Sequence, residues 1–401
     1  MKKIINFSIN IILYFISGFI PKKKNRLVFG SWCGDVYSDN TKYLFEYILE
    51  THKNYELIWV GKKNVLNQVS NNKNVKKLKL NSWLSYYYSV TASCAFVTQD
   101  HRDITKYNIF RGTKLVQLWH GIPLKKIGSD IINVRKKGLM LLLEKTKVKT
   151  TNNFDFFIAS SMENKNKLLT AFKHNNINET KILLTGQPRN DYLINNKNNS
   201  LELIRIRNKL KLILGIPNDK KIIIYLPTFR DNRNNYFSFQ NVSIRSKLMD
   251  ILQENNAVII EKMHFVTNKN LFKQEDKVEK SSLVFQFENE ESLDTQQLLL
   301  VADILITDYS SCYFDYTLMD KPIIHYLYDH DEYISLDRPL YYDIRKVVGG
   351  EIVTDFENLI RVIERSLSNP AINEEKRENV KNFFLENEAG NSSERILKTI
   401  L

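Results

Sequence analysis

The chain has 401 residues, 43% of them hydrophobic and 11% aromatic, so it can bury the cores of two domains and is not intrinsically disordered. Its net charge of +13 favours anionic partners such as phosphates, nucleic acid or an acidic membrane surface, although a Lys- and Asn-rich composition also follows from an AT-rich genome. Three cysteines without a CxxC pair argue against a disulfide framework or a structural zinc site, and they fit a reducing compartment.

The first predicted element is a helix in the uncharged stretch 4–20, which is shorter than the roughly 20 residues that a membrane-spanning helix needs. Asn6, Asn10 and Ser17 form a narrow polar stripe along it, and Lys22–Lys24 follow. This pattern predicts an amphipathic helix that lies in the membrane interface. A signal peptide is disfavoured because no small-residue cleavage site follows, and an ordinary first helix packed on the core is the remaining alternative.

Short apolar runs then alternate with amphipathic stretches, which predicts an α/β fold of GT-B architecture, with two Rossmann-like domains facing each other across a cleft. In the first half we expect strands at Arg26–Phe29, Glu56–Val60, Ala95–Thr98, Lys114–Leu118, Phe154–Ala159 and Ile182–Leu184. In the second half we expect them at Ile222–Tyr225, Ala257–Ile260, Leu283–Phe285, Asp303–Ile306 and Pro322–His325. The expected parts are the helix at 1–24, domains at 25–195 and 196–375, and a C-terminal helix at 376–401 that can pack back on the first domain.

The most informative segment is LVQLWHGIPLKKIG, residues 115–128, in which a predicted strand runs directly into Trp119, His120 and Gly121. Active sites of α/β proteins form at such strand ends. Gly121 leaves room for a substrate beside the imidazole, and the positive charge of Lys125 and Lys126 disfavours imidazolium, as a general base requires. A buried histidine with satisfied hydrogen bonds is the structural alternative.

Two arginines follow other predicted strands. Arg189 lies in GQPRND, residues 186–191, and Arg230 lies in PTFRD, residues 227–231. A guanidinium at a strand end can bind a phosphate through two parallel hydrogen bonds. Each arginine can instead pair with the aspartate that follows it in the chain, Asp191 or Asp231.

The second half contains two further strand ends with polar residues. Lys262 and His264 are two residues apart in VIIEKMH, so both point to one face if the strand continues, and this cationic pair suits a donor phosphate. Asp308 ends another strand, and Ser310 and Ser311 open a predicted helix whose hydroxyls and N–H groups suit an anion. A solvated surface pair and plain helix capping are the respective alternatives.

Other chemistries lack their signatures. The sequence has neither GxGxxG nor GxxxxGK[ST], which excludes the usual dinucleotide and P-loop motifs. The acidic run Asp329–Glu332 offers carboxylates, but neighbours on one loop rarely converge on a single ion. We therefore expect no metal site.

Six segments together resemble the CDP-glycerol glycerophosphotransferase family, which builds teichoic acids and related capsule polymers. They are FGSWCGDVYSDN, WHGIPLKKIG, PTFRD, EKMH, TDYSSCYFDY and RPLYYD, which occur in the family's order between about residue 26 and residue 345. The chain length is similar to that of the family's short, primase-type members. Two positions depart from the family pattern, with Phe229 where Trp is frequent and Phe265 where Pro follows the histidine.

The resemblance implies a GT-B fold, no cofactor or obligatory metal, and peripheral (monotopic) attachment to the cytoplasmic face of the bacterial membrane. It implies that His120 is the catalytic base and that His264 is a second essential histidine at the donor phosphates. The implied donor-binding residues are Lys262, Arg230, Asp308, Ser310, Ser311 and Arg338. The implied acceptor or cleft residues are Trp119, Gly121, Lys125 and Asp35.

We therefore expect a transferase that moves glycerol phosphate, or a related alditol phosphate such as ribitol phosphate, from a CDP-activated donor to an undecaprenyl-linked or polymer glycan, releasing CMP. In this mechanism His120 takes the proton of the acceptor hydroxyl, and Lys262, His264 and the Ser310–Ser311 helix start stabilise charge on the pyrophosphate. The first alternative is a GT-B glycosyltransferase that uses a nucleotide sugar for capsule or lipopolysaccharide synthesis. The second is a non-catalytic protein that binds the membrane surface. No nucleic-acid partner is expected.

Overall fold

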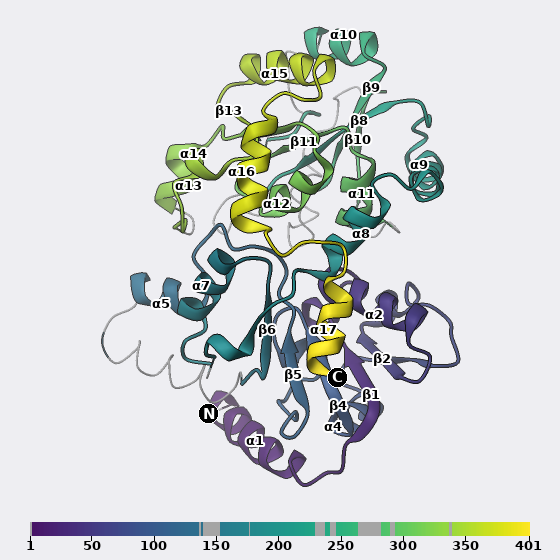
Figure 1. The fold of residues 1–401 in the computed structure, drawn as a ribbon, viewed down its shortest axis with the longest axis vertical. Coiled ribbons are helices and arrows are strands. Elements are labelled where there is room, and N and C mark those ends of the chain that lie inside the picture. Colours follow the sequence, from purple (N-terminus) through teal and green to yellow (C-terminus); the bar gives the residue numbers. More distant parts are fainter. Residues whose placement is uncertain are drawn as a thin grey trace. The chain divides into compact units, whose positions relative to one another are not determined.

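The computed structural model describes residues 2–135, 138, 153–175, 177–228, 237–240, 246–263, 282–288, 293–336 and 339–401. The chain forms two compact units, each built on one parallel sheet (Figure 1). Unit 1 comprises Met1–Gly121, Ile127–Tyr192 and Asn387–Leu401, and unit 2 comprises Ile122–Lys126 and Leu193–Glu386.

The sheet of unit 1 has the strand order β3-β2-β1-β4-β5-β6-β7, and all neighbouring strands are parallel. Its central strands are buried on both faces, which explains their nearly continuous apolar sequences. The strands are β1 (Lys23–Phe29), β2 (Glu56–Gly61), β3 (Val75–Lys79), β4 (Ala92–Val97), β5 (Lys114–Gln117), β6 (Phe156–Ala159) and β7 (Ile182–Leu184). The helices are α1 (Lys2–Ser17), α2 (Asp39–Thr51), α3 (Lys63–Leu66), α4 (Trp83–Val90), α5 (Gly128–Arg135), α7 (Met162–Ala171) and α17 (Ser392–Ile400), with α8 (Pro188–Asn196) at the boundary.

Unit 2 repeats this topology with the order β10-β9-β8-β11-β12-β13, again parallel throughout. Its strands are β8 (Lys221–Leu226), β9 (Ala257–Glu261), β10 (Val284–Gln286), β11 (Ile304–Thr307), β12 (Ile323–Tyr326) and β13 (Glu351–Val353). Its helices are α9 (Ser200–Leu214), α10 (Ser246–Glu254), α11 (Thr295–Val301), α12 (Cys312–Tyr316), α13 (His330–Leu336), α14 (Ile344–Val347), α15 (Phe356–Ser368) and α16 (Glu374–Phe384). The predicted α/β class with two Rossmann-like sheets is confirmed, and every predicted strand has an observed counterpart.

The observed unit boundaries differ from the expected domain boundaries at 195 and 375. Unit 1 ends within α8 at Tyr192, a few residues before the expected boundary at 195. Ile122–Lys126 belong to unit 2 because this segment bonds to the stretch 339–341: the Lys126 N–H donates to the Pro339 carbonyl at 2.8 Å, and the Tyr341 N–H donates to the Leu124 carbonyl at 2.9 Å. Lys125 therefore lies in unit 2, and its ammonium is 5.7 Å from the ring centroid of Tyr333.

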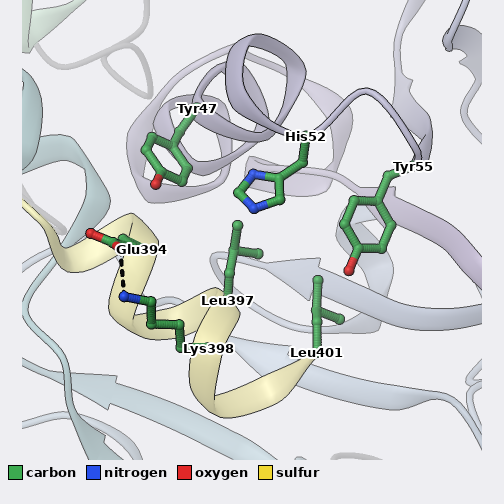
Figure 2. Close-up of a pocket in the computed structure, with 7 residues that line it drawn as sticks. All are labelled: Tyr47, His52, Tyr55, Glu394, Leu397, Lys398 and Leu401. Carbon is green, nitrogen blue, oxygen red and sulfur yellow. Dashed lines mark ion pairs between the residues drawn. The ribbon is translucent and has the colours of Figure 1, made fainter.

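The C-terminal segment returns to unit 1 only from Asn387 onward, whereas α16 packs within unit 2. Helix α17 lies against α2, and Figure 2 shows Leu397 and Leu401 facing the aromatic rings of Tyr47, His52 and Tyr55. The carboxylate of Asp191 accepts the N–H groups of Ser392 and Ser393, both at 2.8 Å, at the start of this helix. One buried aspartate thus fixes the point at which the chain re-enters the core of unit 1.

The N-terminal helix α1 turns its polar stripe toward the protein. Asn10 is buried and its side-chain oxygen accepts the Asn108 N–H at 2.6 Å, and Ser17 is also buried. The outward face instead carries Ile12, Phe15 and Ile16, which are 56%, 52% and 53% exposed, and Phe19, just after the helix, is 86% exposed. Among the helices that the structure describes, none combines the length and the apolar character needed to span a bilayer.

Candidate active site

In both units the chain order along the sheet reverses beside the first strand, between β1 and β4 in unit 1 and between β8 and β11 in unit 2. Ligands of open α/β sheets bind at the carboxyl ends of the strands at such a switch point. We therefore expect the functional residues of each unit at these strand ends.

His120 follows β5 at the carboxyl edge of the unit 1 sheet. Its Nδ1 lies 3.1 Å from the carbonyl oxygen of Thr98, the residue that follows β4. A carbonyl oxygen only accepts hydrogen bonds, so Nδ1 carries the proton and the lone pair of the neutral imidazole is on Nε2. This is the tautomer that a histidine base acting through Nε2 requires.

Two tryptophans pack against the imidazole of His120. The ring of Trp119 stacks on it with a centroid distance of 4.2 Å and an interplanar angle of 27°, and the ring of Trp32 lies at 4.8 Å. Both tryptophans have positive φ angles, 53° and 48°, and Gly121 has a φ of 136°, a conformation that glycine adopts far more readily than other residues. The histidine is thus presented on a strained turn whose shape depends on Gly121.

The backbone of this turn is held by side chains from distant parts of the sequence. The Asn40 amide donates to the carbonyls of Leu118 and Trp119 at 2.9 and 3.1 Å. The Arg189 guanidinium donates to the His120 carbonyl at 2.9 Å and forms an ion pair with Asp39 at 2.7 Å. Arg189 therefore pairs with Asp39.

The remaining predicted residue of unit 1 is Asp35. It forms an exposed ion pair with Lys62, the residue after β2. Its side chain is 45% exposed, and such pairs contribute little to stability. A role for Asp35 in acceptor binding, and an effect of Lys125 on the protonation of His120, stay predictions.

In unit 2, Asp308 lies at the switch point as the residue after β11. It is fully buried, and its Oδ1 accepts the N–H groups of Thr228 at 2.8 Å and Tyr309 at 2.6 Å. His325 of β12 is buried behind it, with Nδ1 3.5 Å from the Asp308 carbonyl oxygen, and burial lowers the pKa of His325 to about 4. Asp308 thus ties the ends of β8 and β11 together.

Ser310 and Ser311 lie immediately before α12, as predicted from the sequence. Ser311 makes no side-chain capping bond to this helix, and Ser310 hydrogen-bonds to the thiol of Cys312. Capping of α12 by the Ser311 hydroxyl is therefore not observed.

Lys262 follows β9, and its backbone N–H donates to the Tyr225 carbonyl at 3.0 Å. Its ammonium lies 5.5 Å from the ring centroid of Phe287. The preceding residue, Glu261, is buried and accepts the Ser238 hydroxyl at 2.9 Å and the Phe239 N–H at 2.6 Å; burial raises its pKa to about 7. His264, Arg230 and Arg338 lie outside the described residues, so their predicted roles stay predictions.

The sequence pattern singled out His120, and it named Arg189 only as a candidate phosphate ligand; it did not single out Asn40, Thr98 or Trp32, which also hold His120. Their positions in the sequence could have indicated a role at the site: Trp32 and Asn40 lie in the family-like segment FGSWCGDVYSDN, and Arg189 follows a predicted strand. Within the described part of the chain, no group of three or more His, Cys, Asp or Glu side chains could hold a metal ion.

Known proteins resemble this chain over nearly its full length. A sequence model for the family described as CDP-Glycerol:Poly(glycerophosphate) glycerophosphotransferase matches residues 12–401. The chain is 33% identical over 406 residues to the teichoic acid glycerol-phosphate transferase of Staphylococcus aureus, covering 100% of this chain and 98% of that protein. It is 30% identical over 400 residues to the teichoic acid poly(glycerol phosphate) polymerase of Bacillus spizizenii, covering 97% and 95%.

Solved structures extend the likeness to the fold. A histidine-to-alanine variant of the wall teichoic acid polymerase TagF matches with a TM-score of 0.79 and 26% identity, covering 100% of this chain and 96% of that one. A histidine-to-asparagine variant of the same polymerase, soaked with CDPG, gives a TM-score of 0.75 and 25% identity, covering 99% and 94%. The two parallel sheets are therefore those of a GT-B-like structure.

Proposed function

Because the chain belongs to the CDP-glycerol:poly(glycerophosphate) glycerophosphotransferase family, we propose that it transfers glycerol phosphate from CDP-glycerol to a teichoic-acid-type glycan and releases CMP. The observation that carries the proposal is His120 at the carboxyl edge of the unit 1 sheet, with Nδ1 directed to the Thr98 carbonyl. This leaves Nε2 as the basic nitrogen. The relatives' names favour glycerol phosphate, and ribitol phosphate is the alternative that the assay below distinguishes.

In the proposed reaction His120 is the general base. Its Nε2 takes the proton of the acceptor hydroxyl while that oxygen attacks the donor phosphorus that carries glycerol. The new bond joins the acceptor oxygen to this phosphorus, and the bond from the phosphorus to the bridging oxygen of CMP breaks. CMP leaves with the electron pair of that bond, so charge develops on the pyrophosphate oxygens.

The donor is assigned to unit 2 in this proposal. Lys262 follows β9, and Ser310 and Ser311 follow β11, whose end Asp308 ties to the end of β8. These groups offer a positive charge and hydrogen-bond donors to a pyrophosphate. His264, Arg230 and Arg338 are assigned to the same donor by the family resemblance. No metal ion is part of the mechanism.

A donor panel tests the proposed function directly. With a glycerol-phosphate-primed glycan as acceptor, we expect CMP release from CDP-glycerol and at least about tenfold less from CDP-ribitol, UDP-glucose or GDP-mannose, because a pocket built to hydrogen-bond one donor rejects others. EDTA should leave the rate unchanged. Faster release of UDP or GDP would support a nucleotide-sugar glycosyltransferase. Acceptor binding without release of any nucleotide would support a non-catalytic binding protein.

The proposal includes peripheral membrane attachment through α1. Its exposed face carries Ile12, Phe15 and Ile16, and the exposed residues Phe19, Lys23 and Lys24 follow the helix. The Arg111 guanidinium lies 4.6 Å from the ring centroid of Phe15 and adds a cation beside the apolar residues. Apolar side chains bordered by cations are the pattern of helices that lie in an anionic interface.

Replacing Phe15 and Phe19 by serine should weaken binding to vesicles of phosphatidylcholine and phosphatidylglycerol about 100-fold, since two phenyl groups together contribute roughly 3 kcal/mol. Co-sedimentation with the vesicles measures the effect. The matched control replaces Leu201 and Leu212 of α9, which are 79% and 85% exposed but lie in unit 2. Equal binding of both double variants would remove α1 from the proposal.

A further inference from the structure

We propose that Asp103 is a positioning residue for His120, acting through the peptide group that joins Thr98 to Gln99. This inference rests on the proposed function, in which His120 is the base. Asp103 ends the short 3-10 helix η2 (His101–Asp103), which follows β4, and it was not singled out by the sequence pattern.

The carboxylate of Asp103 accepts hydrogen bonds from Thr98 and from the next residue, Gln99. Its Oδ2 accepts the N–H of Thr98 and the N–H of Gln99, both at 2.8 Å, and the Thr98 hydroxyl donates to the same oxygen at 3.1 Å. Its Oδ1 accepts the Cys33 N–H at 2.7 Å. The carboxylate is thus held by three backbone N–H groups and one hydroxyl.

One of these bonds connects Asp103 to the imidazole. The Gln99 N–H and the Thr98 carbonyl belong to one peptide group, and that carbonyl accepts the bond from His120 Nδ1 at 3.1 Å. The connection runs from the carboxylate through the peptide N–H and C=O to the Nδ1–H of the ring. Hydrogen bonds in such a chain polarise one another, so a negative charge on the N–H side strengthens the carbonyl as an acceptor.

A second connection holds the aromatic residue that packs on His120. The hydroxyl of Thr98, which donates to Asp103, accepts the Trp32 N–H at 3.2 Å, and the Cys33 N–H donates to Asp103 directly. Trp32 and Cys33 both have positive φ angles, 48° and 52°. Asp103 therefore stabilises the strained turn from which the Trp32 ring reaches the imidazole.

The position of Asp103 is rigid. Its side chain is fully buried, and Gly30, at the end of β1, packs so closely that a Cβ at position 30 would lie 2.3 Å from the Asp103 carbonyl oxygen. Burial raises the pKa of Asp103 to about 7, against the effect of the backbone N–H donors. The charged and titratable groups that interact with Asp103 are Asp100, Arg102 and Cys33, and Asp100 is paired with Arg102 at 2.6 Å.

A purely structural role and a positioning role predict different results. If the Asp103 carboxylate has only a structural role, its removal lowers the stability of the protein and leaves the titration of His120 unchanged. A carboxylate connected to the Nδ1–H also stabilises the imidazolium that forms during proton transfer, so its removal changes the titration of the ring. The titration midpoint then moves to lower pH, because the charged form of the ring loses a favourable interaction.

The experiment compares Asp103→Asn with Asp155→Asn in the full-length protein. Asp155 is the control, because its Oδ2 also accepts a backbone N–H, that of Leu115 at 2.8 Å, and burial also raises its pKa. Its contact is at the start of β5, whereas His120 follows the end of this strand. The rate of CMP release from CDP-glycerol is measured against pH. In parallel, the NMR signals of isotope-labelled histidines are titrated, and the His120 signal is identified by its absence in His120→Ala.

We expect Asp103→Asn to lower kcat about 10- to 100-fold, as for other groups that orient a functional imidazole, with KM for the donor within about twofold. The acidic limb of the rate profile and the titration midpoint of the His120 ring should both move to lower pH, and Asp155→Asn should change neither. An unchanged His120 titration in Asp103→Asn would overturn the inference.

Two further readouts keep the test decisive. The Asn variant turns an NH2 group toward one of the N–H donors, so if it does not fold, Asp103→Ser removes the charge without that contact. In the unmodified protein, the 15N spectrum of neutral His120 must show the proton on Nδ1, and a proton on Nε2 would contradict the connection. If His120→Ala retains normal turnover, the proposed function of His120 fails, and that result is separate from a failure of Asp103.

Discussion

Replacing His120 by alanine is expected to reduce the rate of CMP release from CDP-glycerol by about 10²- to 10⁴-fold, the contribution of a positioned general base. The variant lacks the Nε2 that takes the acceptor proton, whereas the donor groups assigned to unit 2 are unchanged. The loss should therefore appear in kcat, with the dissociation constant for CDP-glycerol within about twofold of the unmodified protein. Steady-state kinetics and calorimetric titration with the donor measure the two quantities.

His52→Ala is the control for this prediction. His52 follows α2, where its ring contacts the Thr51 hydroxyl at 2.7 Å, and it has no role in the proposed mechanism. Its variant should turn over at the normal rate. Near-normal turnover of His120→Ala would remove His120 from the chemistry, and a large loss of donor affinity would show that His120 acts mainly in binding.

Replacing Arg189 by alanine is expected to lower the free energy of unfolding by about 3 kcal/mol and to impair turnover as well. Arg189 is buried, and its removal leaves the carboxylate of Asp39 without this ion pair and the His120 carbonyl without this donor. Breaking a buried pair by removing one partner costs about 3–5 kcal/mol. Because the same guanidinium holds the backbone of His120, the folded variant should also have a lower kcat.

Urea unfolding measures the stability of this variant, and Arg205→Ala provides the comparison. Arg205 pairs with Glu202 on α9, but its side chain is 44% exposed, so its loss should cost at most about 1 kcal/mol. Arg189→Lys should recover only part of the stability, since an ammonium does not reproduce the geometry of the planar guanidinium. Equal unfolding midpoints for Arg189→Ala and Arg205→Ala would contradict the assigned role.

Much of the fold was predictable because most strands are buried on both faces and therefore appear as apolar runs. The two strands that were missed, β3 and β13, are both at sheet edges. The sequence of β3, VKKLK, contains three lysines, and β13 has only three residues. Edge strands pair on one side only and often carry charged residues, so their sequences resemble those of loops.

The site was predictable only in part, for a different reason. His120 follows an apolar strand directly, so its place at a carboxyl edge could be inferred from local sequence. The residues that hold it could not be inferred, because Asn40 is 78 residues away in the sequence from Leu118, which it contacts, and Arg189 is 69 residues away from His120. The polar stripe of α1 shows the same limit, since periodicity identifies a stripe but tertiary hydrogen bonds decide which way it faces.

The return of Asn387–Leu401 to unit 1 has a consequence for biosynthesis. Ile396, Leu397 and Ile400 of α17 belong to the core that also contains β1 and α2, which are among the first segments made. A chain emerging from the ribosome cannot complete that core until the whole of unit 2 has been translated, although domains usually fold in the order of their synthesis. The nascent N-terminal half therefore exposes the apolar residues that α17 covers until the last segment is made, and a protein shortened after α16 would expose them permanently.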